Sequence, residues 1–337
     1  MAHETLVLDA AQSRALLPMR SCMEVMRSVF AALAVGDAQQ PLRTILWLDD
    51  KRGGMGMMPG ALPAQNALGV KAVTVFPSNS STTYETHQGV ILLHDMAHGL
   101  LRAIVDAGVV TAIRTAAVSA LATDLLARKD ARTLAILGAG TQARAHLEAM
   151  LFVRPFERVQ LWSLHSERAQ SLSAWADRSI PDHPPIELCD CAQTAIENAD
   201  VVCTLTASHE PIVKRQWLAP GAHINAVGAC TPDARELDSA TVAQARVIVD
   251  RLESALMESG DVRIPIAEGA FDASHIAGEL GDVVTGACEG RRTDDELTIF
   301  DSLGLAVEDV AAAQCIYEQA LAQDVGVRVR FATEREP

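Results

Sequence analysis

The stretch that decides the fold is Leu134-Ala-Ile-Leu-Gly138-Ala-Gly140-Thr-Gln-Ala143, in which a short apolar run leads straight into Gly-x-Gly-x-x-Ala. An amphipathic segment over residues 145–151 follows, so the glycines lie between a predicted strand and a predicted helix. In such a turn the first glycine permits the tight bend, the second lets the backbone approach a pyrophosphate, and the small third residue packs helix on strand. The N–H groups of the helix N-terminus add an anion site. The pattern predicts dinucleotide binding; the alternative is an ordinary strand–helix turn that binds nothing.

From this turn onward, short apolar strands alternate with helical patterns. The predicted strands cover residues 133–137, 158–162, 186–189, 200–205, 222–227 and 246–249. This alternation predicts a parallel sheet covered by helices on both faces. Ligands of such sheets bind beyond the carboxyl ends of the strands, where Thr206 and Gly228 stand.

The block that precedes the turn has a different pattern. A helix is predicted over residues 22–33 and ends at Gly36-Asp37, and a long alanine-rich helix is predicted over Val109–Leu126. Between them we expect strands over residues 42–48, 69–76, 89–94 and 100–105, the last two joined by a hairpin turn at 95–99. One more helix, over residues 306–321, is expected to pack back on this first block, and the Gly- and Asp-rich segment 260–293 is given no element. We therefore expect a discontinuous first domain, residues 1–115 and 305–337, around a second domain, residues 116–304.

Composition excludes several classes of partner. The 337 residues include 43 acidic and 28 basic ones, a net charge of −15, which argues against nucleic acid and anionic membranes as partners. No apolar run of about 18 residues and no signal peptide is recognised, so we expect no membrane span. Seven scattered cysteines are typical of free thiols in the cytoplasm. Their one close pair, Cys189-Asp-Cys191, fits no common zinc spacing, and no metal is predicted.

The end of the second predicted strand bears on the identity of the cofactor. NAD-specific folds carry an acidic residue there for the ribose 2′-OH, and here Ser163 takes that position. Without a carboxylate to repel it, a 2′-phosphate could be bound by Ser163, His165, Ser166 and Arg168. This favours NADP(H), with NAD(H) still possible, although no arginine follows the strand directly. The alternative is that these are solvated loop residues and that cofactor choice is loose.

Three cations stand within apolar stretches of the first block, namely Arg43, Lys71 and Arg114. Buried lysine and arginine are rare unless they are paired. Each of the three could extend its charged end to the surface or pair with an acid. Three such cations in one domain, in a chain with a dinucleotide turn, favour a shared role in binding a small carboxylate.

With these residues in place, the chain resembles the ornithine cyclodeaminase/μ-crystallin family along nearly its full length. The matching segments begin at Pro41, Lys71, Thr111, Leu137, Pro220, Glu258 and Ile299, and read PLRT, KAVT, TAIRTAAVSA, LGAGTQA, PGAHINAVGA, ESGD and IFDSLGLAVED. The resemblance implies a homodimer with an α/β fold: a Rossmann-type doubly wound parallel sheet, and an α+β substrate-binding and dimerisation domain formed by both chain ends. It also implies a nicotinamide cofactor and a small α-amino or α-imino acid substrate.

The resemblance assigns roles to individual residues. Arg43, Lys71 and Arg114 match the positions that hold the substrate carboxylate. Thr86, His87, Thr206, Val227 and Ser302 match cofactor-contacting positions. Together with the glycine-rich turn and the loop after the second predicted strand, the expected cofactor contacts are Thr86, His87, Thr115, Gly138, Ala139, Gly140, Thr141, Gln142, Ala143, Ser163, His165, Arg168, Thr206, Ala207, Val227, Gly228 and Ser302. For His87 alone, a structural role would otherwise be favoured.

One departure from the family pattern narrows the activity. Ornithine cyclodeaminases and the archaeal alanine dehydrogenases of the family have an aspartate where this chain has Cys230, whereas μ-crystallin has a small neutral serine there. A largely neutral thiol handles protons less well than a carboxylate, and imine reduction needs no covalent nucleophile at this position. The resemblance therefore favours reduction of a cyclic ketimine carboxylate, such as 1-pyrroline-2-carboxylate or 1-piperideine-2-carboxylate, to a cyclic L-amino acid, with a proton supplied by Lys71 or water. The alternatives are an ornithine cyclodeaminase, an alanine-type or N-alkyl amino-acid dehydrogenase, or a nicotinamide-dependent binding protein.

Overall fold

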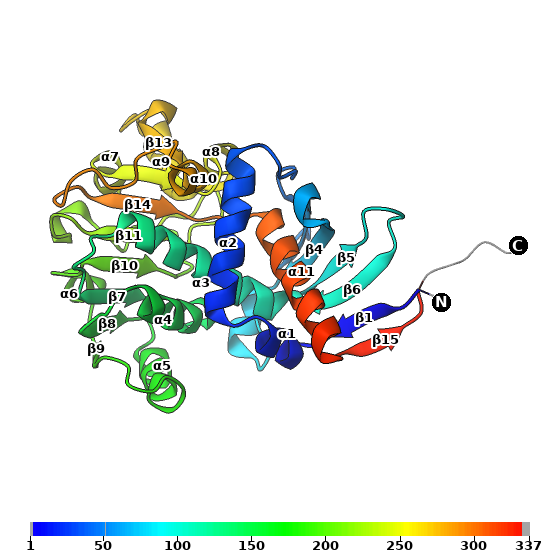
Figure 1. Cartoon of the computed structure of the whole chain (residues 1–337). Helices are drawn as coiled ribbons and strands as arrows, with labels where there is room; N and C mark the ends of the chain where they lie inside the picture. The colour runs from blue at the N-terminus through cyan, green and yellow to red at the C-terminus, as the bar shows by residue number, and fades with distance from the viewer. Residues whose placement is uncertain (1–2, 51, 332–337) are drawn as a thin grey trace, which may run out of the picture. The chain divides into compact units, whose positions relative to one another are not determined.

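The computed structural model describes residues 3–50 and 52–331 (Figure 1). Contacts between residues divide the chain into two compact units. Unit 1 holds the described residues up to Arg114 together with those from Leu305 onward, and unit 2 holds Thr115–Gly304. The first unit is thus built from both ends of the chain.

Unit 2 contains a parallel sheet of eight strands in the order β13-β12-β14-β11-β10-β7-β8-β9. Its strands are β7 (Thr133–Leu137), β8 (Arg158–Trp162), β9 (Ile186–Leu188), β10 (Val201–Thr204), β11 (His223–Ala226), β12 (Arg246–Val249), β13 (Ile276–Glu279) and β14 (Thr298–Asp301). The predicted parallel sheet and its six predicted strands are confirmed. Strands β13 and β14 were not predicted, and β13 lies inside the segment that was given no element.

The helices of unit 2 follow most of its strands, as Figure 1 shows. They are α4 (Thr141–Val153), α5 (Ser166–Ser179), α6 (Ala192–Ile196), α7 (Ser239–Ala243), α8 (Leu252–Glu258), α9 (Gly260–Ala267) and α10 (Leu280–Thr285). The core between sheet and helices is made of fully buried aliphatic side chains such as Leu137, Val202 and Ile224. The chain runs from β7 outward to β8 and β9 and then returns to β10 on the other side of β7. Because the strand order reverses between β7 and β10, the carboxyl ends of these two strands mark the expected ligand site.

Unit 1 contains a seven-stranded sheet in the order β15-β1-β6-β5-β4-β3-β2. Its strands are β1 (Thr5–Leu8), β2 (Thr44–Trp47), β3 (Gly54–Leu62), β4 (Ala67–Val75), β5 (His87–His94), β6 (Leu101–Asp106) and β15 (Val327–Val329), and its helices include α1 (Ala10–Leu16), α2 (Met19–Ala34) and α11 (Ala306–Gln323). Helix α11 packs on β3, β4, β5 and α2, so the expectation that it returns to the first block is confirmed (Figure 1). The predicted hairpin is also present: β5 and β6 are antiparallel, and Asp95 accepts hydrogen bonds from the turn amides.

Strand β3 is the main element that the sequence did not predict. Its sequence, GMGMMPGAL, reads as a loop, yet residues facing opposite sides of the sheet alternate between buried and exposed. The glycines serve close packing, since a Cβ added at Gly60 would lie 3.1 Å from the Val307 side chain of α11. The packing of α11 against β3, rather than the strand propensity of its own residues, therefore explains the glycine at position 60.

Helix α3 (Ala107–Leu126) corrects the expectation that no segment is long enough for a membrane span. By length and composition alone it could cross a membrane, with a mean hydropathy of 1.5 over an 18-residue window. However, 78% of that window is buried inside the protein, and Arg114 lies within the helix. Burial of this extent is typical of a core helix, which passes the same test of length and hydropathy.

Candidate functional site

The glycine-rich turn directly follows β7. Gly138 has a φ of +121°, in a region that favours glycine, and its amide donates to Trp162 O at 2.8 Å. A Cβ at this position would lie 2.6 Å from Leu205 O, the carbonyl that follows β10. Position 138 therefore requires glycine both for its backbone conformation and for the close approach of the β10 end.

The second glycine of the turn, Gly140, caps the N-terminus of α4 with extended backbone. A Cβ added there would meet no atom within 4 Å among the described residues, so the space in front of the helix N-terminus is open. Gln142 Oε1, on the first turn of α4, is buried and has no hydrogen-bond partner in the described part of the chain. Ala143 is fully buried against the sheet. Open space at the helix N-terminus and a buried polar atom without a partner fit a bound dinucleotide pyrophosphate, with Ala139 and Thr141 completing the turn.

Beyond β8, the predicted ribose residues lie in the loop that enters α5. Ser163 is half-buried and its hydroxyl accepts a long hydrogen bond, 3.4 Å, from the amide of His165. His165 and Arg168 are exposed, and Glu167 lies 4.0 Å from His165 Nδ1. The loop thus holds one acidic side chain, Glu167, beside the basic side chains of His165 and Arg168. The position that is acidic in NAD-specific folds is nevertheless occupied by Ser163.

The ends of β10, β11 and β14 hold the remaining predicted cofactor residues of unit 2. Thr206 and Ala207 follow β10, Val227 and Gly228 follow β11, and the buried Ser302 follows β14 and donates its amide to Ala226 O at 2.9 Å. Cys230 is half-buried, and its thiol donates to Val227 O at 3.1 Å. Thr115 is buried on α3.

Two of the three predicted carboxylate-binding cations form a buried cluster in unit 1. Lys71 on β4 and Arg114 on α3 are each 3% exposed. Lys71 Nζ lies 2.6 Å from Asp309 Oδ2, and Arg114 Nε lies 2.9 Å from Asp309 Oδ1. Arg114 also pairs with Glu308 at 2.7 Å. One carboxylate of α11 therefore bridges both cations. For Lys71 and Arg114 the alternative of pairing with an acid is thus observed, and their role in binding a substrate carboxylate stays a prediction.

Burial and these ion pairs act in opposite directions on the cluster. Burial lowers the pKa of Lys71 to about 8, although the Asp309 carboxylate opposes that shift. Burial on its own would raise the pKa of Asp309, but Arg114 and Lys71 hold that pKa below its usual value. Lys71 is therefore charged at neutral pH and gives up its proton more readily than an exposed lysine does.

Arg43, Thr86 and His87 lie in the same unit. Arg43 is half-buried just before β2, and its charge is close enough to lower the pKa of Lys71 further. Thr86 Oγ1 lies 3.0 Å from His87 Nδ1 at the start of β5. Partial desolvation and the Lys71 charge lower the pKa of His87, which indicates that this ring also lies near the cluster. The cofactor roles of Thr86 and His87 stay predictions, as do those of the other predicted cofactor residues, all of which belong to unit 2.

The sequence did not single out four acidic residues that the structure brings to these sites: Glu308 and Asp309 in unit 1, and Glu236 and Asp261 in unit 2. All are buried. A signal existed for the first two, because they interrupt the buried apolar run over residues 306–313 at the start of α11, and buried carboxylates need partners. Glu236 and Asp261 sit in loop-like sequence and carried no such signal.

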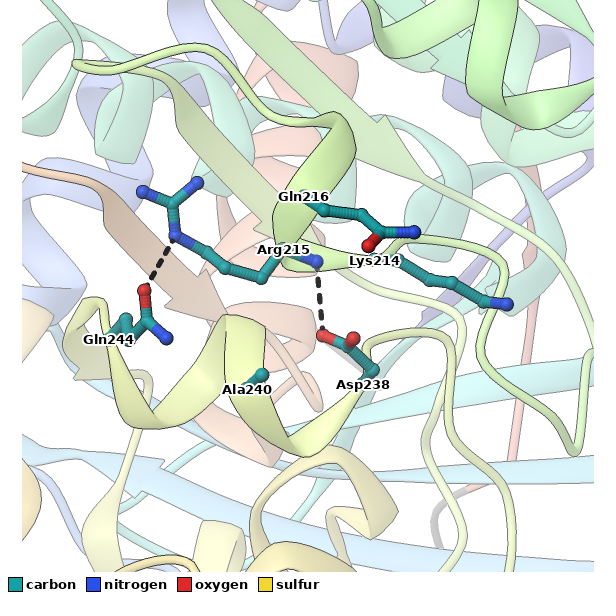
Figure 2. Close-up of a pocket in the computed structure, with 6 residues that line it drawn as sticks. All are labelled: Lys214, Arg215, Gln216, Asp238, Ala240 and Gln244. Atoms are coloured by element: carbon teal, nitrogen blue, oxygen red, sulfur yellow. Dashed lines mark hydrogen bonds between the residues drawn. The ribbon is translucent and has the colours of Figure 1, made fainter.

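A surface hollow of about 460 Å³ in unit 2 does not coincide with the predicted site (Figure 2). Its lining residues are Lys214, Arg215, Gln216, Asp238, Ala240 and Gln244. Arg215 is engaged there, since its Nε donates to Gln244 Oε1 at 3.1 Å and its amide donates to Asp238 Oδ1 at 3.2 Å. Among residues 3–50 and 52–331, no group of three or more His, Cys, Asp or Glu side chains could hold a metal ion.

A glycine-rich turn at the switch point of a parallel sheet, together with a second unit that holds a buried cation cluster, defines a dinucleotide-binding α/β enzyme. Residues 3–324 match the model of the ornithine cyclodeaminase/mu-crystallin family, and the chain belongs to that family. Ketimine reductase mu-crystallin of Mus musculus is 41% identical over 287 residues, which covers 84% of this chain and 86% of that protein. The Delta(1)-pyrroline-2-carboxylate reductase of Bacillus cereus is 37% identical over 332 residues, 97% of this chain and 100% of that one.

Solved structures agree with this assignment. Delta(1)-pyrroline-2-carboxylate reductase of Thermococcus litoralis, in complex with NADH and L-proline, superposes with a TM-score of 0.94 at 37% identity over 96% of this chain and 100% of that one. An archaeal alanine dehydrogenase dimer with bound NAD gives a TM-score of 0.92 at 32% identity, covering 98% of this chain and 100% of that one.

Proposed function

We propose that this chain is an NAD(P)H-dependent ketimine reductase that converts a small cyclic imine carboxylate, such as 1-pyrroline-2-carboxylate or 1-piperideine-2-carboxylate, to the cyclic L-amino acid. The observation that carries the proposal is the buried Lys71, whose pKa is lowered to about 8 and which Asp309 holds beside Arg114. A cation of this kind can bind a carboxylate and can also lend a proton near neutral pH. Relatives named for the same reaction, at 41% and 37% identity, support it.

The nicotinamide, when bound, supplies the hydride for the imine carbon. The residues of this chain do the rest. Arg43 and Arg114 hold the substrate carboxylate, and Lys71 gives a proton to the ring nitrogen, so that one hydride and one proton turn the C=N bond into CH–NH. Asp309 keeps Lys71 charged and in place. Cys230, whose thiol proton is donated to Val227 O, supplies a small neutral group where a carboxylate would favour deamination chemistry.

The experiment that tests this function follows the loss of reduced-nicotinamide absorbance with each imine, with NADPH and NADH in separate reactions. Ornithine is assayed in parallel for proline, and pyruvate is tested with methylamine or ammonia. Turnover of a cyclic imine at least tenfold better than the other substrates is expected. Release of proline from ornithine with no imine turnover would favour a cyclodeaminase, and cofactor binding without any turnover would favour a binding protein.

A nicotinamide dinucleotide is the cofactor, and we propose that NADPH is preferred to NADH. Ser163 supports this, because it places no carboxylate against a 2′-phosphate. Changing Ser163→Asp is expected to lower kcat/KM for NADPH by about tenfold or more, while NADH is affected little, because the new charge repels the phosphate. The ratio of the two kcat/KM values is the measurement. Ser171→Asp, at an exposed position on α5, the helix that the Ser163 loop enters, is the matched control, and a wild type that prefers NADH would contradict the proposal.

We also propose that the chain forms a homodimer in the cytoplasm. The support for a dimer is an apolar face of the unit 1 sheet. Leu46 on β2 lies opposite Met55 on β3. Ala72 on β4 lies between Met57 on β3 and Val90 on β5. Leu46 is 69% exposed, Met55 42% and Met57 39%. A sheet face this apolar is expected to be covered by a second copy.

The dimer proposal predicts that Leu46→Asp combined with Met57→Asp gives a monomer. Two buried charges at an apolar interface each lose hydration without a partner, so association should weaken by about a hundredfold or more. Light scattering after size exclusion measures the mass. Leu321→Asp changes another exposed leucine of unit 1 and should leave the dimer intact; a wild type that is already monomeric would refute the proposal.

A further inference from the structure

Glu236 joins two loops at the carboxyl edge of the parallel sheet. Its side chain is fully buried. Oε1 accepts hydrogen bonds from the amide of Thr206 at 2.7 Å and from its hydroxyl at 2.6 Å, whereas Oε2 accepts from the amide of Gly228 at 2.8 Å. Thr206 follows β10 and Gly228 follows β11, so one carboxylate fixes the ends of two adjacent strands.

The backbone of Glu236 is itself held by hydrogen bonds on both sides. Asp261 Oδ1 accepts from the amides of Glu236 and Leu237, at 2.9 and 2.8 Å, and Glu236 O accepts from the amides of Ile212 and Val213. Gly228 allows the approach, because a Cβ there would lie 2.5 Å from Glu236 Oε2. Three donors therefore converge on the two carboxylate oxygens. A carboxylate, which only accepts hydrogen bonds, satisfies all three donors. A glutamine amide in its place would have to point its NH2 group at one of these donors.

Topology indicates what these loops serve. The turn after β7 takes the pyrophosphate and the end of β8 takes the adenosine ribose, so the ends of β10 and β11, across the switch point, are left for the nicotinamide half of the cofactor. We propose that Glu236 is a positioning residue that holds the Thr206 and Gly228 loops in the conformation that orients the nicotinamide for hydride transfer. This inference rests on the proposed function.

The test compares Glu236→Gln with wild type in two measurements. The first is the affinity for the preferred reduced dinucleotide and for the matching ADP-ribose fragment, which lacks the nicotinamide. The second is kcat and imine KM. Fragment affinity should stay within about twofold and imine KM should change little, whereas kcat should fall by about 10- to 100-fold, because misplacing a reacting group by about 1 Å costs that much. Glu236→Asp keeps the acceptor charge but is one methylene shorter, so it should recover part of kcat and serves if the glutamine variant does not fold.

Asp238→Asn is the matched control, because Asp238 caps α7 from the same loop and contacts neither Thr206 nor Gly228. It should keep kcat. Equal loss of fragment and dinucleotide affinity, in step with a lower unfolding temperature, would mean that Glu236 only stabilises the fold and would overturn the inference. So would a normal kcat in Glu236→Gln. A wild type that binds no dinucleotide would refute the proposed function, and this inference with it.

Discussion

Replacing Asp309 with asparagine is expected to move the alkaline limb of the kcat/KM profile of imine reduction downward by about one pH unit or more. In the wild type that limb should lie near pH 8, because kcat/KM requires protonated Lys71, and burial lowers the pKa of Lys71 to about 8. Asp309 is the group that raises this pKa against burial. With the carboxylate gone, the ammonium loses its proton at a lower pH, so activity declines earlier as pH rises.

The same substitution leaves two buried cations with one acidic partner fewer, which typically costs about 3–5 kcal/mol of stability. Glu308→Gln separates the two effects, because Glu308 forms an ion pair with Arg114, whereas Lys71 forms one with Asp309. That variant should lose stability as well, yet keep its alkaline limb near the wild-type position. The measurement is kcat/KM from about pH 6 to about pH 9, with thermal unfolding of each variant. Identical limbs in wild type and Asp309→Asn would show that Lys71 does not set the pH dependence.

The cluster also shows how far sequence reasoning reaches. Apolar context singled out Lys71 and Arg114, and pairing with an acid was one alternative to a role in binding a carboxylate. The identity of the partner could not be predicted, since Asp309 stands 195 residues after Arg114 in the sequence, and only the return of α11 onto β4 brings them together. Glu236 was not predicted for a similar reason, because its partners Thr206 and Gly228 lie in loops that follow two different strands.

The local sequence predicted those elements whose structure depends mainly on neighbouring residues. The β7 turn, α2, α4 and the β5–β6 hairpin follow from periodicity and from glycine at fixed positions. Local sequence failed for β3, where helix α11 packs closely against Gly60. It also failed for β1 and β15, which are short and pair at the edge of a sheet whose other strands are far away in the sequence. Long-range packing selects such residues, and no window of neighbouring residues contains that information.

Changing Gly140→Val is expected to weaken binding of the dinucleotide by about a hundredfold or more, roughly 2.7 kcal/mol, with little loss of stability in the absence of ligand. The weaker binding and the small loss of stability are both expected from one observation. A Cβ at position 140 meets no atom within 4 Å among the described residues, and the backbone there is extended, so a side chain can start at this position without a clash at its Cβ. The same open space is where a pyrophosphate would approach the α4 amides, and a valine side chain would fill it.

Gly138→Ala gives the contrasting control. There the positive φ and the Cβ–Leu205 O approach of 2.6 Å should destabilise the protein itself by about 1–3 kcal/mol. Titration of reduced-nicotinamide fluorescence gives the dissociation constants, and thermal unfolding without cofactor gives the stabilities. Gly140→Val should therefore lose affinity at nearly constant stability, since a valine N-cap costs only about 1 kcal/mol. If Gly140→Val instead binds the cofactor as tightly as wild type, the pyrophosphate does not lie against this helix, because no dinucleotide could share that space with two added methyl groups.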